Sequence, residues 1–166
     1  MPEHDAFAAF VTDNHARLMR IATRLVKDTH SAEDVVQTAL AGVFVVWQRG
    51  TVDCVEAYAV RVLVNTAIGW DRRSRRRPES LFAVLPEGPV SYPIDQWLDR
   101  SELWRSVRRL PIRLRHVIVL RYYLDLSEEQ TAAVLGVARG TVKSQTARAL
   151  QHLRRRHLAH ADSLPR

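Results

Sequence analysis

The sequence predicts an all-α protein: two small helical domains joined by an extended, proline-containing linker. Apolar residues recur at helical spacing through residues 1–74 and again through 96–160. Residues 75–95 show no such period and contain prolines, which favour an extended path over a helix. Near the C-terminus, residues 126–156 have the pattern of two short helices around a glycine turn. The linker prolines are Pro78, Pro86, Pro89 and Pro93.

Positive charge is concentrated in two parts of the chain. The formal net charge is +7, and the excess of Arg and Lys lies in residues 71–77 and 131–166. One Arg cluster is usually just a solvated surface, but two separated clusters on a near-neutral chain suggest a polyanion bound at two points. The single Cys54 excludes an internal disulfide and a multi-Cys metal site. With no signal peptide and no run long enough to span a bilayer, we expect a cytoplasmic protein that does not bind membranes.

Three helices are expected in the first domain. They cover about 4–27, then Ser31 to Arg49, and then Cys54 to Arg73. Ser31 and Asp34 resemble a capping box at the start of the second helix. The large aromatic side chains are expected to fill the core between the helices, namely Phe44, Trp47 and Trp70.

Polar residues mark one face of the second and of the third helix. The second helix presents an acidic and amide face on its first two turns, for which the ordinary explanation is the helix dipole. The third helix has basic and amide residues on or beside its polar face. The residues are Glu33, Asp34 and Gln37 on the second helix and Arg61, Asn65, Arg72 and Arg73 on the third.

The second domain begins with an apolar stripe and ends in a helix-turn-helix pattern. Pro111 starts a helix, Ser127 and Gln130 form a capping box, and Gly136 ends the next helix. Ala132 allows close approach of the two helices, and Val142 anchors the second on the first. The outward face of the second helix is basic, which favours DNA binding over an ordinary helical hairpin. The stripe comprises Trp97, Leu98, Leu103, Trp104, Val107 and Leu110; the outward residues are Arg139, Lys143, Ser144 and Arg148.

Nearly the whole chain resembles the bacterial extracytoplasmic-function sigma factors. Residues 31–50 resemble the polymerase-binding helix of that group, with Asp34, Gln37 and Trp47 at matching positions. Residues 56–77 resemble the helix that engages the −10 promoter element, and residues 109–155 resemble the −35-reading domain. The resemblance implies a region 2-like domain at 1–74 and a region 4-like domain at 96–160. It also implies core RNA polymerase and promoter DNA as partners, with an anti-sigma factor as a further candidate.

The resemblance also assigns roles to residues of the first domain. It implies that Glu33, Asp34 and Gln37 dock on the coiled coil of the polymerase clamp. Separated strands at −10 would be held by the third helix, with Arg72 and Arg73 on phosphates, Asn65 on a base or the backbone, and Arg61 alongside. The resemblance places a pocket for a flipped base at the 50–55 turn, where Tyr58 is a stacking candidate, although its spacing favours a core role. Arg75, Arg76 and Arg77 either contact phosphate or are solvated.

At −35, the second helix of the motif would enter the major groove. Arg139 is the best candidate for a base contact, with Ser144 and Gln145 next, since arginine pairs with guanine O6 and N7. Thr141, Lys143 and Arg148 are expected to hold phosphates. The chain departs from the family pattern at four positions, which are Thr131, Ala138, Gln145 and Thr146. Thr131 and Thr146 are expected to soften packing of the helix-turn-helix, and Gln145 is expected to change the −35 sequence preference.

Two other classes of function are weighed against this one. A stand-alone helix-turn-helix regulator would explain the C-terminal motif equally well, but the first 95 residues contain no phosphoacceptor pattern, heptad run or ligand cage. A nucleic-acid enzyme is disfavoured because the seven His are scattered without metal-ligand spacing. We therefore expect no metal, no cofactor and no catalysis. Because there is no nucleotide-hydrolysis motif, strand opening would be driven by binding energy.

Overall fold

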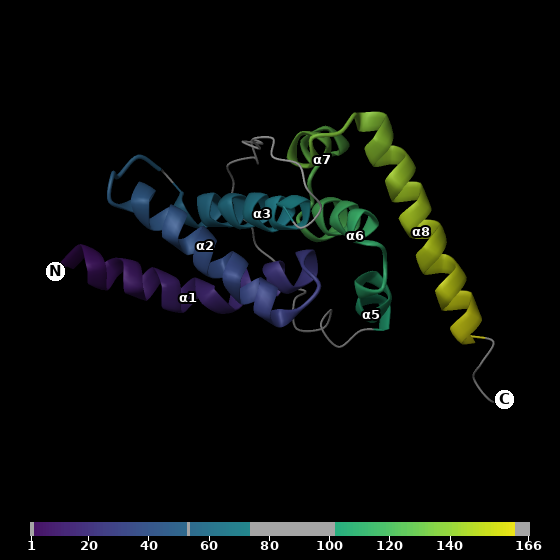
Figure 1. Cartoon of the computed structure of the whole chain (residues 1–166), viewed down its shortest axis with the longest axis horizontal. Helices are drawn as coiled ribbons and strands as arrows, with labels where there is room; N and C mark the ends of the chain where they lie inside the picture. Colours follow the sequence, from purple (N-terminus) through teal and green to yellow (C-terminus); the bar gives the residue numbers. More distant parts are fainter. Residues whose placement is uncertain (1, 53, 74–101, 162–166) are drawn as a thin grey trace. The chain divides into compact units, whose positions relative to one another are not determined.

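A computed structural model describes residues 2–52, 54–73 and 102–161, and all regular structure in these ranges is helical (Figure 1). The all-α prediction is therefore confirmed. Contacts divide the chain into two compact units, Met1–Val90 and Ser91–Arg166. The predicted linker, 75–95, lies outside the described residues, as do Trp97 and Leu98. The domain limits 1–74 and 96–160 remain predictions.

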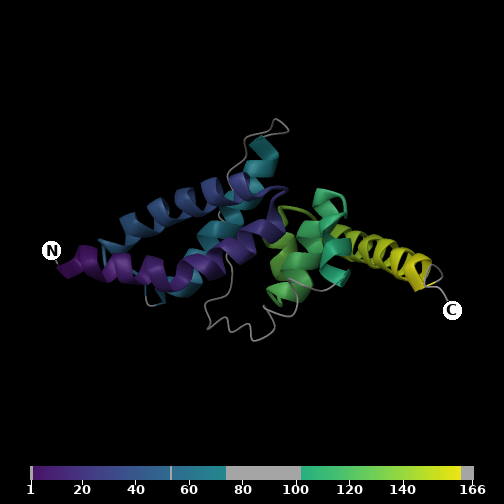
Figure 2. The ribbon, with the colours of Figure 1, turned by 90° about the horizontal axis from the view of Figure 1, so that it is seen from below.

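The first unit is a bundle of three helices, α1 (Pro2–Leu25), α2 (Thr29–Trp47) and α3 (Val55–Arg73). Each helix packs against the other two, and Figure 2 shows them from below. Their inward stripes are aliphatic, and removal of this apolar surface from water is the main stabilising contribution. The side chains with almost no exposure include Leu18, Ile21, Leu25, Val35, Val36, Val43, Leu63 and Val64.

Helix α2 begins earlier than its sequence pattern suggests. Asp28 is its N-cap: one carboxylate oxygen accepts the Ser31 backbone N–H at 2.8 Å, and the other accepts the Ser31 hydroxyl at 2.9 Å. The predicted capping box of Ser31 and Asp34 is therefore wrong, because Ser31 already lies inside the first turn. These two hydrogen bonds lower the pKa of Asp28, and the bond from the Ser31 backbone N–H has the larger effect.

The aromatic part of the first core differs from the prediction. Phe7 lies 4.9 Å from Phe44 and 5.3 Å from Trp47 between ring centroids, and Phe10 lies 5.5 Å from Trp47. Trp70, which was expected beside them, is 37% exposed. Among the α3 residues with described side chains, 55–70, the last buried one is Ile68, so Trp70 lies at the edge of the core.

The second unit contains α5 (Glu102–Arg108), α6 (Ile112–Ile118), the π-helix η1 (Val119–Tyr123), α7 (Glu128–Leu135) and α8 (Arg139–Ala161). Helix α8 packs against α5, α6 and α7, and its end projects beyond them (Figure 2). Pro111 is the N-cap residue of α6, as expected for the start of that helix. Of the predicted stripe, Trp104, Val107 and Leu110 are buried. Leu103 is exposed, because the neighbouring Trp104 takes the inward position on this short helix.

A tight corner between η1 and α7 sets the direction of the helix-turn-helix. The Leu126 N–H donates to the Leu120 carbonyl at 2.9 Å, and Asp125 adopts a left-handed backbone conformation with φ 52°. The Arg121 guanidinium donates a hydrogen bond to the carbonyl of Leu126. Leu126 is the last residue before the N-cap of α7. Arg121 therefore ties the end of η1 to the start of α7.

Candidate functional site

The helix-turn-helix forms as its sequence pattern predicts. The Ser127 hydroxyl accepts the Gln130 N–H at 3.1 Å, and the Gln130 side chain accepts the Ser127 N–H at 2.8 Å, which completes the capping box. Gly136 ends α7 in the left-handed region, with φ 62° and ψ 40°, where glycine carries no steric penalty. Ala132 and Val142 are both buried, as expected for residues between the two helices.

Helix α8 presents a polar face opposite its buried stripe of Val142, Ala149 and Leu153. Four of the predicted DNA-contacting residues are exposed, and two are half-buried beside the stripe. By helical spacing, Arg139 and Lys143 lie along the edge of this face nearer α7. The opposite edge has Thr141, Gln145 and Arg148, and Ser144 lies between the two edges. The half-buried residues are Thr141 and Gln145.

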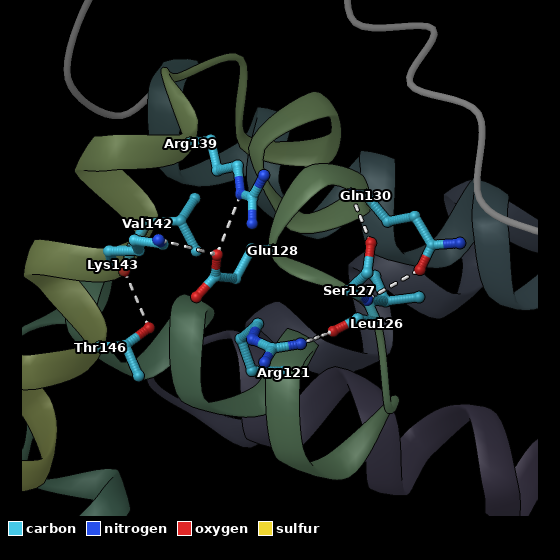
Figure 3. A network of polar contacts seen from close by, with 9 residues as sticks. All are labelled: Arg121, Leu126, Ser127, Glu128, Gln130, Arg139, Val142, Lys143 and Thr146. Carbon is cyan, nitrogen blue, oxygen red and sulfur yellow. Dashed lines mark hydrogen bonds and ion pairs between the residues drawn. The ribbon is translucent and has the colours of Figure 1, made fainter.

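An acidic residue that the sequence analysis missed contacts the cations of this face. Glu128, the first residue of α7, accepts a 3.0 Å hydrogen bond from Arg139 Nε through Oε2, and Lys143 Nζ lies 3.9 Å from the same oxygen (Figure 3). The side chains of Arg139 and Lys143 are 63% and 60% exposed, that of Glu128 27%. Ion pairs with this exposure contribute only about 0.2–1 kcal/mol to folding. Spacing along the chain gave no indication of this contact, because it crosses the turn.

The position of Arg139, in the first turn, is unfavourable for α8 itself. The first turn of α8, Arg139–Val142, contains no acidic residue, and the preceding Ala138 has no side chain that can cap it. Cations near a helix N-terminus oppose the helix dipole. The Glu128 carboxylate offsets this from the neighbouring helix.

Thr131 is an internal weak point of the motif. Its side chain is fully buried, and its hydroxyl has no hydrogen-bond partner within the described part of the chain. An unsatisfied buried hydroxyl costs about 1–3 kcal/mol. By contrast, the Thr146 hydroxyl donates to the Val142 carbonyl at 2.8 Å. The departure at Thr131 therefore has a physical cost, whereas that at Thr146 is accommodated locally.

The acidic and amide residues of α2 lie on an outward face. Glu33 and Gln37 are exposed, and Asp34 is half-buried with its Oδ2 3.8 Å from His30 Nε2. Because α2 begins at Thr29 with Asp28 as its cap, Glu33 and Asp34 lie beyond the first turn. The helix dipole acts mainly within the first turn, so it explains these acids less well than the sequence suggested.

Val45 extends the same face of α2. It follows Asp34 and Gln37 at helical spacing and is 46% exposed, although the neighbouring Val43 is buried. The sequence analysis did not single it out, since an apolar residue in an apolar stretch is normally assigned to the core.

Of the predicted −10 residues, two lie on one edge of α3, namely Arg61 and Asn65. Arg61 and Asn65 are half-buried and one turn apart, and Tyr58 is also half-buried. The Asn65 side-chain oxygen is buried and without a hydrogen-bond partner in the described residues. Arg72 and Arg73 lie in the last turn of α3, with side chains outside the described part. Arg75, Arg76 and Arg77 lie outside it entirely.

The described residues contain no group of three His, Cys, Asp or Glu side chains that could hold a metal ion. Cys54 is half-buried, with its thiol 3.6 Å from a Glu56 carboxylate oxygen. Within the described ranges, no helix has the length and apolar character needed to cross a membrane.

Comparisons with known proteins match both halves of the chain. Residues 10–77 match the family model of Sigma-70 region 2, and residues 100–153 match that of Sigma-70, region 4. The chain is 39% identical over 151 residues to the RNA polymerase sigma-E factor of Streptomyces coelicolor, covering 89% of this chain and 84% of that protein. It is 34% identical to the ECF RNA polymerase sigma factor SigL of Mycobacterium tuberculosis, covering 86% and 84%.

Two solved structures share the fold. One is the sigma factor RpoE in complex with the anti-sigma factor NepR from Bartonella quintana, with a TM-score of 0.56, 23% identity, and coverage of 90% of this chain and 95% of that one. The other is CnrH in complex with the cytosolic domain of CnrY, with a TM-score of 0.53, 23% identity, and coverage of 96% and 91%.

Proposed function

Because this chain belongs to the sigma-70 family, in its extracytoplasmic-function group, we propose that it is a promoter-specificity subunit of bacterial RNA polymerase. It binds core polymerase, directs it to promoters through their −10 and −35 elements, and promotes strand opening. One observation carries this function: a helix-turn-helix with an exposed basic face follows, in the same chain, a region 2 unit. A stand-alone regulator would not need that first unit.

The outward face of α2 is the proposed docking surface for core polymerase. Glu33, Asp34 and Gln37 lie together on it, beyond the turn in which acids would serve the helix itself. Val45 adds an exposed apolar contact on the same face. A mixed acidic, amide and apolar surface suits a partner that presents cations around an apolar centre.

The −10 element is proposed to meet the edge of α3. Strand opening requires bases to leave the stack, at a cost of a few kcal/mol each. Arg72 and Arg73 would hold phosphates, and Asn65 would contact a base or the backbone beside Arg61. The placement of Asn65 one turn from Arg61, with both side chains half-buried and not part of the core, supports this role.

The −35 element is proposed to meet α8 in the major groove. Arg139 is the first base-reading candidate, and Ser144 and Gln145 are the secondary candidates. Thr141, Lys143 and Arg148 would hold phosphates. The exposure of Arg139, Lys143, Ser144 and Arg148 supports this assignment. We assign residues 1–74 to binding of core polymerase and the −10 element, and residues 96–160 to binding of the −35 element. Residues 75–95 join the two domains.

The protein has no catalytic role of its own in this account and acts in the cytoplasm, where core polymerase performs the chemistry. An anti-sigma factor is a proposed partner, since the two similar solved structures are a sigma factor bound to an anti-sigma factor and CnrH bound to the cytosolic domain of CnrY.

The test is run-off transcription with core polymerase on genomic fragments, with and without the purified chain. We expect start sites that appear only when the chain is present. A chain that yields none, yet binds a two-fold symmetric operator unaided as a dimer, would instead be a stand-alone regulator.

A further inference from the structure

Glu128 lies where α7 meets the start of α8. Its Oε2 accepts the Arg139 Nε–H at 3.0 Å and lies 3.9 Å from Lys143 Nζ (Figure 3). The bond uses the inner nitrogen of the guanidinium. The end of the guanidinium, where the two terminal nitrogens each carry an N–H, is not used by this bond and can still form a fork to a ligand.

This contact contributes little to folding. The corner between the two helices is already held by the Ser127–Gln130 capping box and by Gly136. Exposed ion pairs add little to stability. A carboxylate on a DNA-facing surface also weakens attraction to phosphates. Glu128 and Glu129 both lie in the first turn of α7, where acids complement the helix dipole, but of the two it is Glu128 that contacts the cations of α8. That contact points to a task in DNA recognition.

That task follows from the geometry that a guanine contact demands. Arginine reads guanine by two parallel hydrogen bonds to O6 and N7, so the guanidinium plane must be oriented. A long, exposed side chain loses conformational entropy when it is oriented on binding, and a side chain held beforehand loses less. A carboxylate bonded to Nε fixes the plane and leaves the terminal nitrogens for the base.

We propose that Glu128 is a positioning residue for Arg139, and that it sharpens base preference at −35 while it reduces non-specific binding to phosphates. The inference rests on the proposed function and extends it to a residue of the first helix of the motif. Lys143 shares the same carboxylate oxygen, so Glu128 also lowers the net positive charge at the start of α8.

The experiment is selection from a duplex promoter library with a randomised −35 segment, using the full chain bound to core polymerase. Four chains are compared with wild type: Glu128→Ala, Arg139→Ala, the double variant, and Glu129→Ala as the matched control. Glu129 is the exposed neighbour with the same charge. We expect Glu128→Ala to relax preference at the same base positions as Arg139→Ala, by about threefold to tenfold, and Glu129→Ala to leave it unchanged.

Two further readouts separate positioning from a structural role. The double variant should match Arg139→Ala alone, because Glu128 acts on the base through Arg139. The slope of log binding constant against log salt concentration, measured with non-specific duplex, should become steeper by about one in Glu128→Ala. The melting temperature should fall by no more than about 8 °C, the most that an exposed ion pair contributes.

Three results would overturn the proposal. One is an identical selection by Glu128→Ala and Glu129→Ala. Another is a change at base positions that Arg139→Ala leaves untouched, because the carboxylate would then act independently of the guanidinium. A third is a wild-type selection that enriches no −35 sequence, which would remove the DNA-reading role itself and thereby also contradict the proposed function.

Discussion

The N-terminal ends of α2 and α8 use charge in opposite ways. At α2, the helix is capped by its own acid, Asp28, and the further acids Glu33 and Asp34 lie beyond the first turn. At α8, the first turn has no acid, the cation Arg139 opposes the dipole, and compensation comes from Glu128 on another helix. Asp28 lies where folding favours an acid, whereas Glu33 and Asp34 of α2 and Arg139 of α8 do not stabilise their helix ends. The comparison therefore separates residues that stabilise a helix end from residues available to a partner.

The largest effect is expected at the α2 surface. Asp34→Lys should weaken binding to core polymerase at least about 30-fold, because losing one partner of a buried charged contact typically costs 2 kcal/mol or more. The affinity is measured with labelled protein and core polymerase. Asp13→Lys, an exposed acid on α1, is the matched control and should bind like wild type. Unchanged binding by Asp34→Lys would disprove this docking surface.

A second prediction separates base reading from phosphate binding on α8. Arg139→Ala should cost about 1–3 kcal/mol of discrimination at one base position and leave other positions unchanged. Lys143→Ala is the matched comparison and should weaken all sites alike, with a salt slope smaller by about one. Binding to a panel of −35 duplexes at several salt concentrations measures both. If the two variants shift the panel in the same way, Arg139 does not read a base.

A third prediction concerns the core beneath that surface. Thr131→Val should stabilise the second unit by about 1–2 kcal/mol, because it removes an unsatisfied buried hydroxyl without changing the volume much. For a unit of this size that corresponds to an increase in melting temperature of about 4–16 °C. Thr146→Val is the control, since that hydroxyl already has a partner, and it should give no comparable gain. A lower melting temperature for Thr131→Val would mean that its hydroxyl is bonded in solution.

The smallest effect is expected at the cap of α2. The folded-state pKa of Asp28 is lowered, so its stabilising contribution is present above the ordinary carboxyl pKa and is lost as pH falls through the lowered value. Asp28→Asn can still cap the helix but does not titrate in this range. Its melting temperature should therefore fall less than that of wild type between pH 7 and pH 3. An equal fall in both proteins would show that the carboxylate form of Asp28 does not stabilise the helix.

The sequence predicted the parts of the fold that depend on local chemistry. The capping box at Ser127, the left-handed Gly136 and the inward Val142 are each set by a few neighbouring residues. The apolar stripes of the first three helices likewise follow from helical period. Most of the predicted surface residues on α2 and α8 lie outside the buried stripe of their own helix.

The remaining features depend on where one element ends against another. Trp70 has a core-like position in the helical period, but it is exposed, and Ile68 is the last buried residue among the described side chains of α3. Ser31 resembles a cap, but Asp28, three residues earlier, accepts both of its donors. Glu128 meets Arg139 only because Gly136 folds one helix back on the other. None of these is visible in a local pattern, since each is decided by contacts across a turn or between helices.

The most direct measurement is sequencing of run-off transcripts made by core polymerase with the wild-type chain, with Asp34→Lys or with Arg139→Ala on one pool of genomic fragments. The account predicts specific start sites with the wild type, no specific start sites with Asp34→Lys, and redistributed start sites with Arg139→Ala. Loss of all specific initiation with Arg139→Ala, alongside an unchanged profile with Asp34→Lys, would contradict the division of tasks between the two surfaces.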